Sequence, residues 1–328
     1  GALDNTAYSQ IKGDIGTNAG LISGFPSGSV LFGNEHNANA ITAQAVIDLE
    51  AAVAQIKAMP GTTTVAHDPC YGNFVGGETF YPGVYKKGGA VTICGDIILD
   101  AQGDPNALFI FNFEGKLDTY ANASVVLIGC ASPANVFFLS GGAISLATNT
   151  IMVGNLISSP AGAVSGAAGA NLIGRMLSTN GAISVAADVN VDNGVPPIGP
   201  ITQPTCKQPT GSFRIENHSW GNIYTFTPHP PDLTISGTGL VETQYQGTFT
   251  FTVQYSGECS ISPPREIVFS EYINYWEGTT SSDWNDDDNW TCGVPRLNEW
   301  INIIPVIATQ YPYPIISVTG DVGWGAPT

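Results

Sequence analysis

Charged side chains are scarce in this 328-residue chain, and basic ones are the scarcest. Asp, Glu, Lys and Arg together make up 11% of the residues, against about a quarter in an average soluble domain. Ten Lys and Arg stand against 27 Asp and Glu, so the formal net charge is −17. A nucleic-acid binder needs a basic patch, and an anionic membrane surface would repel this chain. We therefore expect neither nucleic acid nor membrane lipid as a partner.

Long apolar runs and the usual enzyme motifs are missing too. No apolar run reaches the roughly 18 residues that would indicate a transmembrane helix, so we expect no membrane insertion. The six cysteines include no CxxC pair, which argues against a zinc ribbon. No HExxH, GxSxG, P-loop or dinucleotide fingerprint occurs. The sequence predicts a protein that is not an enzyme and needs no cofactor or metal.

The cysteine spacing favours disulfides in an oxidising compartment. Cys206 and Cys259 flank one segment of alternating apolar residues, and we expect them to be bonded to each other. Cys70 and Cys94 form a second candidate pair. The protein is accordingly expected to be secreted or held at the cell surface.

Two local arrangements could suggest chemistry. His67 lies three residues before Cys70, but a catalytic pair needs a spatial geometry that nearness in sequence does not supply, so a loop with a disulfide is favoured. Asp283, Asp286 and Asp288 supply closely spaced oxygens, which makes calcium conceivable. They lack the positions of an EF-hand, and a solvated acidic turn is the favoured interpretation.

The sequence does contain a repeat. The phrase GAIS at 142–145 returns as GAVS at 162–165 and as GAIS at 181–184, with offsets of 20 and 19 residues. Looser copies begin at Gly89 and Gly115. Such a period is typical of a solenoid, in which each coil stacks on its neighbour because it cannot bury its apolar face alone.

Alternation along these strands predicts which side chains face outward. The last residue of each phrase is expected to form an outward ladder of Ser145, Ser165 and Ser184. Two residues further on, we expect a second outward ladder of Ala147, Ala167 and Ala186. Two rows of small side chains make a flat face, which suits a flat, repetitive ligand better than a small molecule that needs a pocket.

The remaining segments predict one helix and further β structure. Residues 38–59 have an apolar stripe at helical spacing, expected to pack along the solenoid and made of Ile41, Ala45, Leu49, Ala52, Val53 and Ile56. The solenoid is expected to fill residues 1–195 and a Pro-rich linker residues 196–204. Alternating strands over 205–268 predict a β-sandwich, and residues 269–328 begin a third β-rich module.

Residues 1–195 resemble the ice-binding-like family of bacteria and microbial eukaryotes. The resemblance rests, in order, on GDIGTN (13–18), GFPSG (24–28), the Ala- and Gln-rich helix, LDAQGDPNALFIF (99–111) and GRMLS (174–178). It implies a mostly β fold: a right-handed, three-faced β-solenoid with one long α-helix packed alongside. It also implies a secreted or surface protein that binds ice.

The ice-active face of this family tends to show the pattern Thr-Ala/Gly-x-Thr/Asn, which TYAN at 119–122 and LATN at 146–149 match in part. The candidate ice-face residues are Thr119, Asn122, Ser145, Ala147, Thr148, Asn149, Ser165, Ala167, Ser184 and Ala186. Asp118 and Tyr120 are expected to roughen that face. The family usually has another apolar strand before the segment that matches residues 2–6, so we expect that strand to lie outside this numbering or to come from a neighbouring chain.

The later segments resemble modules of Bacteroidetes-type surface proteins. Residues 205–211 and 247–259 are similar to their immunoglobulin-like repeats, and residues 276–293 to another recurrent segment. The resemblance implies an immunoglobulin-like β-sandwich followed by a further β module in a modular surface protein.

Three function classes follow. The first is ice binding, with ice or another flat, extended surface as the partner. The alternative is a non-enzymatic adhesin or a polymerising surface fibre, in which open strand edges would recruit copies of this chain or other surface proteins. A carbohydrate-active enzyme is least favoured, because the paired acids at fixed distance that it needs cannot be picked out.

Overall fold

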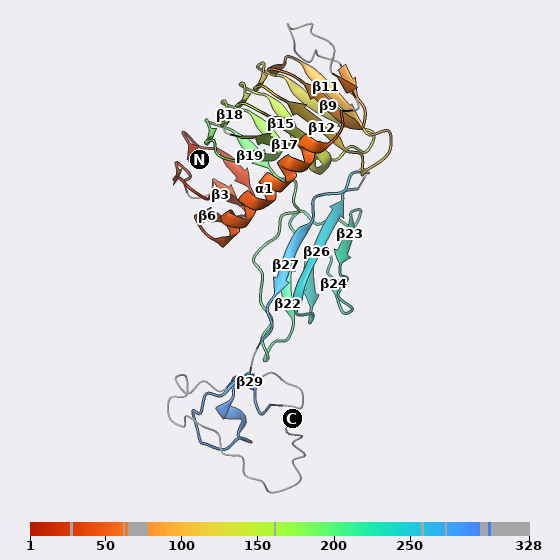
Figure 1. Ribbon diagram of the computed structural model, residues 1–328. Helices are drawn as coiled ribbons and strands as arrows, with labels where there is room; N and C mark the ends of the chain where they lie inside the picture. Colours follow the sequence, from red (N-terminus) through yellow and green to blue (C-terminus); the bar gives the residue numbers. More distant parts are fainter. Residues whose placement is uncertain are drawn as a thin grey trace. The chain divides into compact units, whose positions relative to one another are not determined.

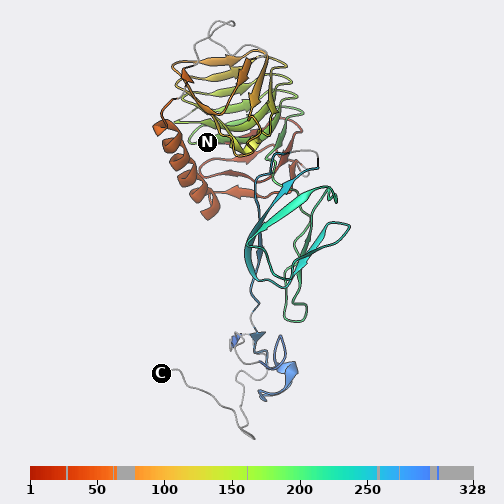
Figure 2. The same ribbon diagram turned by 90° about the vertical axis from the view of Figure 1, so that its right-hand side faces the viewer.

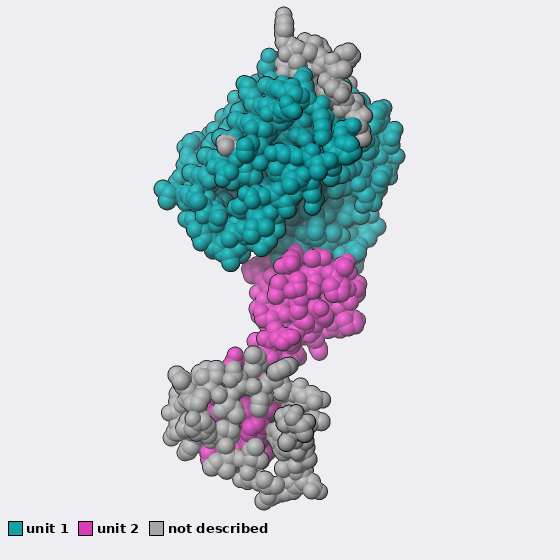
Figure 3. All heavy atoms as spheres, viewed as in Figure 1, with its two compact units in different colours: residues 1–198, 219–225, 251–265 teal, residues 199–218, 226–250, 266–328 magenta. Residues whose placement is uncertain are grey.

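The computed structural model describes residues 1–26, 29–61, 63–64, 78–160, 162–256, 259–272, 274–295 and 301–302. The chain divides into two compact units (Figure 3). Unit 1 contains residues 1–198, 219–225 and 251–265, and unit 2 contains residues 199–218, 226–250 and 266–328. Within the described ranges, no helix is long and apolar enough to cross a bilayer.

Unit 1 is built from parallel strands that stack coil upon coil into a solenoid (Figure 1). Strands at equivalent positions of successive coils form a seven-stranded parallel sheet, and we call its outer surface face A. In sheet order its strands are β10 (Val91–Ile93), β13 (Leu117–Thr119), β16 (Ile144–Leu146), β18 (Val164–Gly166), β20 (Ile183–Val185), β1 (Leu3–Asn5) and β4 (Ile22–Ser23). The repeated GAIS phrases thus lead into neighbouring strands of one sheet, which confirms the stacked repeat.

A second parallel sheet, of 12 strands, bends around one edge of the solenoid and covers its two other faces. The outer surface of the first arm is face B, with β8 (Glu78–Phe80), β11 (Asp96–Asp100), β14 (Ser124–Ile128), β21 (Asn190–Asp192), β2 (Gln10–Lys12) and β5 (Val30–Leu31). The outer surface of the second arm is face C, with β7 (Thr63–Thr64), β9 (Gly83–Lys87), β12 (Phe109–Phe113) and β15 (Val136–Ser140). Both arms contain part of β17 (Ile151–Ser158) and of β19 (Asn171–Ser178).

The bend falls at Gly154 in β17 and Gly174 in β19. The part of β17 before Gly154 pairs with β14, and the part after it pairs with β15. Both glycines have positive φ, and a Cβ on Gly174 would collide with the backbone of Gly154. Glycine alone lacks that Cβ and adopts such φ values readily, so both long strands can turn at the same point.

The N-terminal segment adds two coils to the far end of the stack. Leu3 of β1 pairs with Ile183 of β20, and Gln10 of β2 pairs with Asn190 of β21. The third strands of these coils, β3 (Ile15–Thr17) and β6 (Glu35–Asn37), pair with each other. Figure 2 shows these N-terminal strands, in red, stacked next to the green coils. The first strands of the chain therefore complete the stack beside its last coil.

The helix predicted over residues 38–59 is observed as α1 (Ala40–Ala58). Its N-cap residue Asn39 accepts a hydrogen bond from the Thr42 backbone, and the Thr42 hydroxyl accepts one from the Asn39 backbone, which forms a capping box. Val53 and Ile56 pack on face C against Ile110, Leu139 and Ile157. The helix thus covers face C (Figure 1).

The first half of the predicted apolar stripe does not face the solenoid. Ile41 is 58% exposed and Ala45 is also exposed, whereas Leu49 and Ala52 are half-buried. Twelve residues separate Ile41 from Val53, and at about 3.6 residues per turn that rotation places them roughly 120° apart around the helix. Residues spaced four apart, as Ile41, Ala45, Leu49 and Val53 are, therefore rotate gradually around the helix, and only the later ones face the solenoid.

Unit 1 has an apolar interior lined by all three faces. Tyr85, Phe111 and Phe138 stack from successive coils, with ring centroids 5.1 Å and 4.7 Å apart. Equivalent positions in stacked parallel strands lie about 4.8 Å apart, so aromatic rings at these positions reach stacking distance without distortion.

Residues 205–269 contain two three-stranded sheets. One consists of β22 (Gly211–Arg214), β25 (Leu240–Thr243) and β24 (Thr234–Ile235), and the other of β23 (Ile223–Thr227), β26 (Gly247–Gln254) and β27 (Arg265–Phe269). Phe213 from the first sheet packs against Phe249 and Phe269 from the second, with centroids 6.4 Å away in each case. The immunoglobulin-like topology stays a prediction, as does the third module, of which β28 (Asn274–Tyr275) and β29 (Ile301–Asn302) are described.

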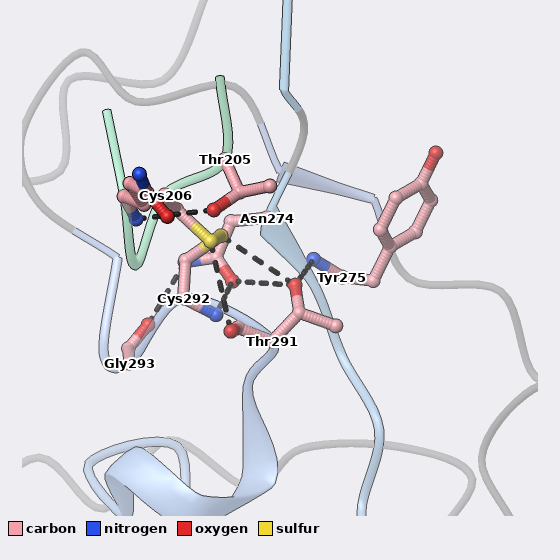
Figure 4. Close-up of a disulfide and its surroundings, with 8 residues drawn as sticks. Thr205, Cys206, Asn274, Tyr275, Thr291, Cys292 and Gly293 are labelled. Atoms are coloured by element: carbon pink, nitrogen blue, oxygen red, sulfur yellow. Dashed lines mark hydrogen bonds between the residues drawn. A yellow bond between two sulfur atoms is a disulfide. The ribbon is translucent and has the colours of Figure 1, made fainter. Parts of the chain in front are cut away.

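The predicted bond between Cys206 and Cys259 is wrong. Cys259 is bonded to Cys130, which follows β14, and Cys206 is bonded to Cys292 (Figure 4). Flanking one β segment does not bring these two cysteines together, because distant loops meet in the fold and supply different partners. Cys94 is also disulfide-bonded, and its predicted partner Cys70 lies outside the described residues.

Asn274 holds the loop at the second disulfide in place. Its side-chain oxygen accepts a hydrogen bond from the Cys292 backbone at 3.1 Å, and its amide nitrogen donates to the Gly293 carbonyl at 2.8 Å (Figure 4). Asn274 is 1% exposed, so these bonds satisfy a buried amide.

The acidic segment considered for calcium forms a turn around the short 3-10 helix η2 (Asp287–Asn289). The hydroxyls of Thr280 and Ser281 donate to the Asp286 carboxylate at 2.7 and 3.0 Å and lower its pKa. Asp283 accepts from the Asn285 backbone at 3.0 Å. No group of three or more His, Cys, Asp or Glu residues suited to a metal ion occurs in the described part of the chain.

Candidate functional site

Face A has a continuous ladder of outward polar residues. Ser145 pairs with Ser165, and Ser165 pairs with Ser184, in the register expected from the repeat. In sheet order the full ladder is Thr92, Asp118, Ser145, Ser165, Ser184, Asp4 and Ser23. The ladder therefore has serines at its centre and acidic residues on either side of them.

The second row of face A is flat only in part. Ala147, Ala167 and Ala186 are half-buried in successive coils. Tyr120 occupies the equivalent place one coil before Ala147 and is 55% exposed. Next to it, Asp118 forms an ion pair with Lys116 at 2.5 Å. These side chains roughen face A at this end.

Thr119, one of the candidate ice-face residues, lies inside the solenoid. It is 6% exposed, and its hydroxyl is 2.8 Å from that of Thr150 and accepts a hydrogen bond from the Ala147 backbone at 2.8 Å. Thr119 lies two residues after the buried Leu117, and alternation points both inward. The short sequence pattern that selected it did not take this alternation into account.

The corner between faces A and B carries the other candidates. Thr148, Asn122 and Asn149 are exposed there, and both asparagines have positive φ, at 63° and 56°. Asn adopts this left-handed conformation more readily than most residues, so the turn itself explains the choice of residue. The Asn149 amide also donates to the Asn122 side-chain oxygen at 3.5 Å, which links the two coils.

Face B carries an exposed aliphatic surface that was not predicted. Its members are β-branched residues with between 40% and 49% of their area exposed: Val126, Ile128, Ile151 and Ile173. They come from β14, β17 and β19, three strands of one arm of the 12-stranded sheet. Alternation along these strands predicts that the aliphatic side chains point outward. It does not predict whether solvent or another segment of the chain covers them.

The row of face B that contains Ile151 is otherwise polar. Ser124 pairs with Ile151, Ile151 with Asn171, and Asn171 with Asn190. The row ends in charged or amide groups, with Asp96 next to Ser124 and Gln10 next to Asn190. This row therefore presents a hydroxyl, an aliphatic side chain and then amides in successive coils.

The comparisons with known proteins point to one family. The family model described as Ice-binding-like matches residues 1–190. An ice-binding protein of Nostoc sp. (strain HG1) is 31% identical over 185 residues, which are 56% of this chain and 65% of that protein. Ice-binding protein 1 of Shewanella frigidimarina (strain NCIMB 400) is 33% identical over 116 residues, or 13% of its length. The chain thus spans less than two thirds of either relative.

Solved structures give the same result for the fold. The ice-binding protein of the Antarctic ascomycete Antarctomyces psychrotrophicus matches with a TM-score of 0.53 and 30% identity, over 58% of this chain and 89% of that chain. An ice-binding protein from an Antarctic Flavobacteriaceae bacterium matches with a TM-score of 0.52 and 34% identity, over 58% of this chain and 43% of that chain. Because the family match covers residues 1–190 of 328, more than half of the chain, this protein belongs to the ice-binding-like family.

Proposed function

We propose that this protein binds ice through face B and the corner that joins it to face A. The observation that carries the proposal is the exposed aliphatic surface of Val126, Ile128, Ile151 and Ile173 on stacked parallel strands. A contiguous exposed apolar patch on a soluble protein marks a surface that meets something. The ice-binding relatives support ice as that partner.

The arrangement suits an ordered water surface. Regularly spaced methyl groups order the water around them, and hydroxyl and amide groups between them can hydrogen-bond into the same layer. Each such contact is weak. The stacked coils hold the groups in place before binding, so little ordering entropy is lost when many contacts form at once.

The other two faces fit this role less well. Face C is covered by α1, whose Val53 and Ile56 pack on it. Face A carries the ion pair between Lys116 and Asp118 and the protruding Tyr120. The serines and alanines of face A remain candidates, and the corner residues Asn122, Thr148 and Asn149 adjoin face B directly because β14 and β17 begin there.

A matched pair of variants tests the choice of face. Ile151→Tyr with Ile173→Tyr places two bulky rings on face B, and Ser145→Tyr with Ser165→Tyr places two on face A. We expect the face B variant to lose most of its thermal hysteresis, because rings that stand above the surface keep the remaining groups away from ice. The face A variant should retain it. Circular dichroism and the unfolding midpoint check that both variants are folded.

The opposite result, with activity lost only in the face A variant, would move the site to the serine and alanine ladders. If both variants keep their thermal hysteresis, the activity does not depend on these two faces.

A second candidate function is assembly through the end of the stack. The seven-stranded sheet ends at β4 and the 12-stranded sheet at β5. Leu21, next to β4, is 73% exposed, and Phe32, next to β5, is 44% exposed. A terminal strand with apolar neighbours can pair with a strand of another chain. Sedimentation velocity tests this role: concentration-dependent fibres that Leu21→Ser and Phe32→Ser abolish would support it, and a monomer at all concentrations would rule it out.

We also infer a secreted or cell-surface location and a non-catalytic role. The described cysteines are all in disulfides, as expected for an oxidising compartment. Protein localisation by cell fractionation tests this inference, and recovery of the reduced protein from the cytosol would contradict it.

A further inference from the structure

Three of the ten Lys and Arg residues of this chain line one hollow of unit 1. The hollow has a volume of about 620 Å³, and its polar lining includes Lys57, Lys86, Lys87, Asn112, Glu114 and Ser159. With a net charge of −17, the surface elsewhere is predominantly acidic. A local concentration of cations in such a protein therefore needs an explanation.

The hollow lies where the helix stops covering face C. Lys57 is in the last turn of α1, and the Lys86 ammonium donates to the Lys57 carbonyl oxygen at 3.4 Å. Lys86 pairs with Asn112, and Asn112 pairs with Leu139, so these residues occupy one row of face C in three successive coils. Leu139 in this row packs against α1 and is fully buried, whereas Lys86 and Asn112 are half-buried and line the hollow.

The opposite wall is the corner that leads from face C to face A. Gly88, Glu114, Gly141 and Pro160 each come from a different coil at this corner. Coils repeat at about 4.8 Å, so four of them extend over roughly 14 Å. The hollow is therefore long enough for a short chain of linked rings, and it follows the solenoid axis.

We propose that this hollow binds an acidic saccharide through its carboxylate groups. The three lysines that line the hollow, Lys57, Lys86 and Lys87, supply the charge complement. A concave site strengthens such attraction because the surrounding protein displaces solvent. The net negative charge of the protein repels anions at long range. An anionic ligand is therefore attracted by the lysines only when it is in contact with them.

The remaining groups favour a sugar over a phosphate. Asn112 supplies amide donors and an acceptor, and Ser159 supplies a hydroxyl. The Glu114 carboxylate accepts hydrogen bonds from sugar hydroxyls, and it repels a phosphate dianion more strongly than a singly charged uronate carboxylate. Pro160 and the methylene stems of the lysines offer apolar surface to a sugar ring. This mixture fits a uronic acid, which combines hydroxyls with one carboxylate per ring.

Isothermal titration calorimetry of the full chain with trigalacturonate tests the proposal. The double variant Lys57→Gln with Lys87→Gln leaves the Lys86 hydrogen bond to the helix end in place. We expect it to bind roughly tenfold or more weakly, because hydrogen bonds to charged groups are lost. The control Lys207→Gln removes an exposed lysine of unit 2 and should stay within about twofold of the unmodified protein.

Maltotriose and inorganic phosphate complete the design. Maltotriose has rings but no carboxylate and should not bind measurably, and phosphate should not displace trigalacturonate at equal concentration. Absence of binding by the folded protein, or unchanged binding in the double variant, would overturn the proposal. Phosphate competition at equal concentration would overturn the saccharide assignment in favour of a simple anion site. The double variant should keep its thermal hysteresis, since the hollow is separate from face B.

Discussion

The hydroxyl groups of Thr119 and Thr150 lie 2.8 Å apart inside the solenoid, and Thr119 also accepts from the Ala147 backbone. We predict that Thr119→Val lowers the free energy of unfolding by about 1–3 kcal/mol, because it leaves the half-buried Ala147 N–H without its acceptor. Guanidinium denaturation measures the change. Thermal hysteresis should not change. A stable Thr119→Val protein that has lost thermal hysteresis would contradict the buried, structural role.

Asp232 gives the clearest expected pH dependence. The Thr243 hydroxyl and the Gln244 backbone N–H both donate to its carboxylate at 2.6 Å and lower its pKa. A lowered pKa in the folded state stabilises the protein above the ordinary Asp pKa of about 3.9, and this contribution is lost as pH falls through the folded value. Asp232 is exposed, so solvent screening keeps the effect small.

The variant Asp232→Asn isolates this effect. The unmodified protein should have the higher Tm at pH 7, and the difference should shrink as the pH drops below about 4. A Tm difference that stays constant from pH 7 to pH 2 would show that the carboxylate charge contributes nothing.

At the scale of the element, α1 stabilises unit 1 through its second half. Ile56 is buried against face C, whereas Ile41 is exposed. We predict that Ile56→Ala costs about 2–4 kcal/mol of unfolding free energy and Ile41→Ala less than about 0.5 kcal/mol. Denaturant titration of both variants measures the difference. Equal losses would mean that the entire helix packs on the solenoid.

The sequence predicts some properties of the strands and of the helix better than others. The GAIS repeat predicts the strands and register of face A, because nearly identical phrases at nearly equal spacing take equivalent positions in successive coils. Asn39 and Pro60 mark the helix ends through their capping and breaking chemistry. The spacing of apolar residues alone does not determine which side of the helix packs, because small errors in the assumed period accumulate as rotation along the helix. No local sequence pattern predicts that β1 pairs with β20.

The candidate site shows the same limit. Alternation predicts the outward Ser165 correctly and would have excluded Thr119, whose parity is that of the buried Leu117. It cannot show that Ile151 and Ile173 are exposed, because an apolar outward row could equally lie beneath another segment. Exposure of a face depends on what the rest of the chain covers.

At the scale of the whole molecule, two disulfides join parts of the chain that are far apart in sequence. Cys130–Cys259 has a sequence separation of 129 residues and Cys206–Cys292 one of 86. We predict that non-reducing peptide mapping finds these two linkages. A peptide that joins Cys206 to Cys259 would contradict the fold of both units, since each cysteine is held beside a different partner.

Uptake into growing ice tests the central claim most directly. The fluorescently labelled, unmodified protein is mixed with an inert control protein, an ice hemisphere is grown slowly in the solution, and both proteins are measured in ice and in liquid. Face B should hold the protein on the ice front, so we predict its enrichment in the ice while the control stays in the liquid. Exclusion of this protein from ice to the same extent as the control would contradict the proposed function.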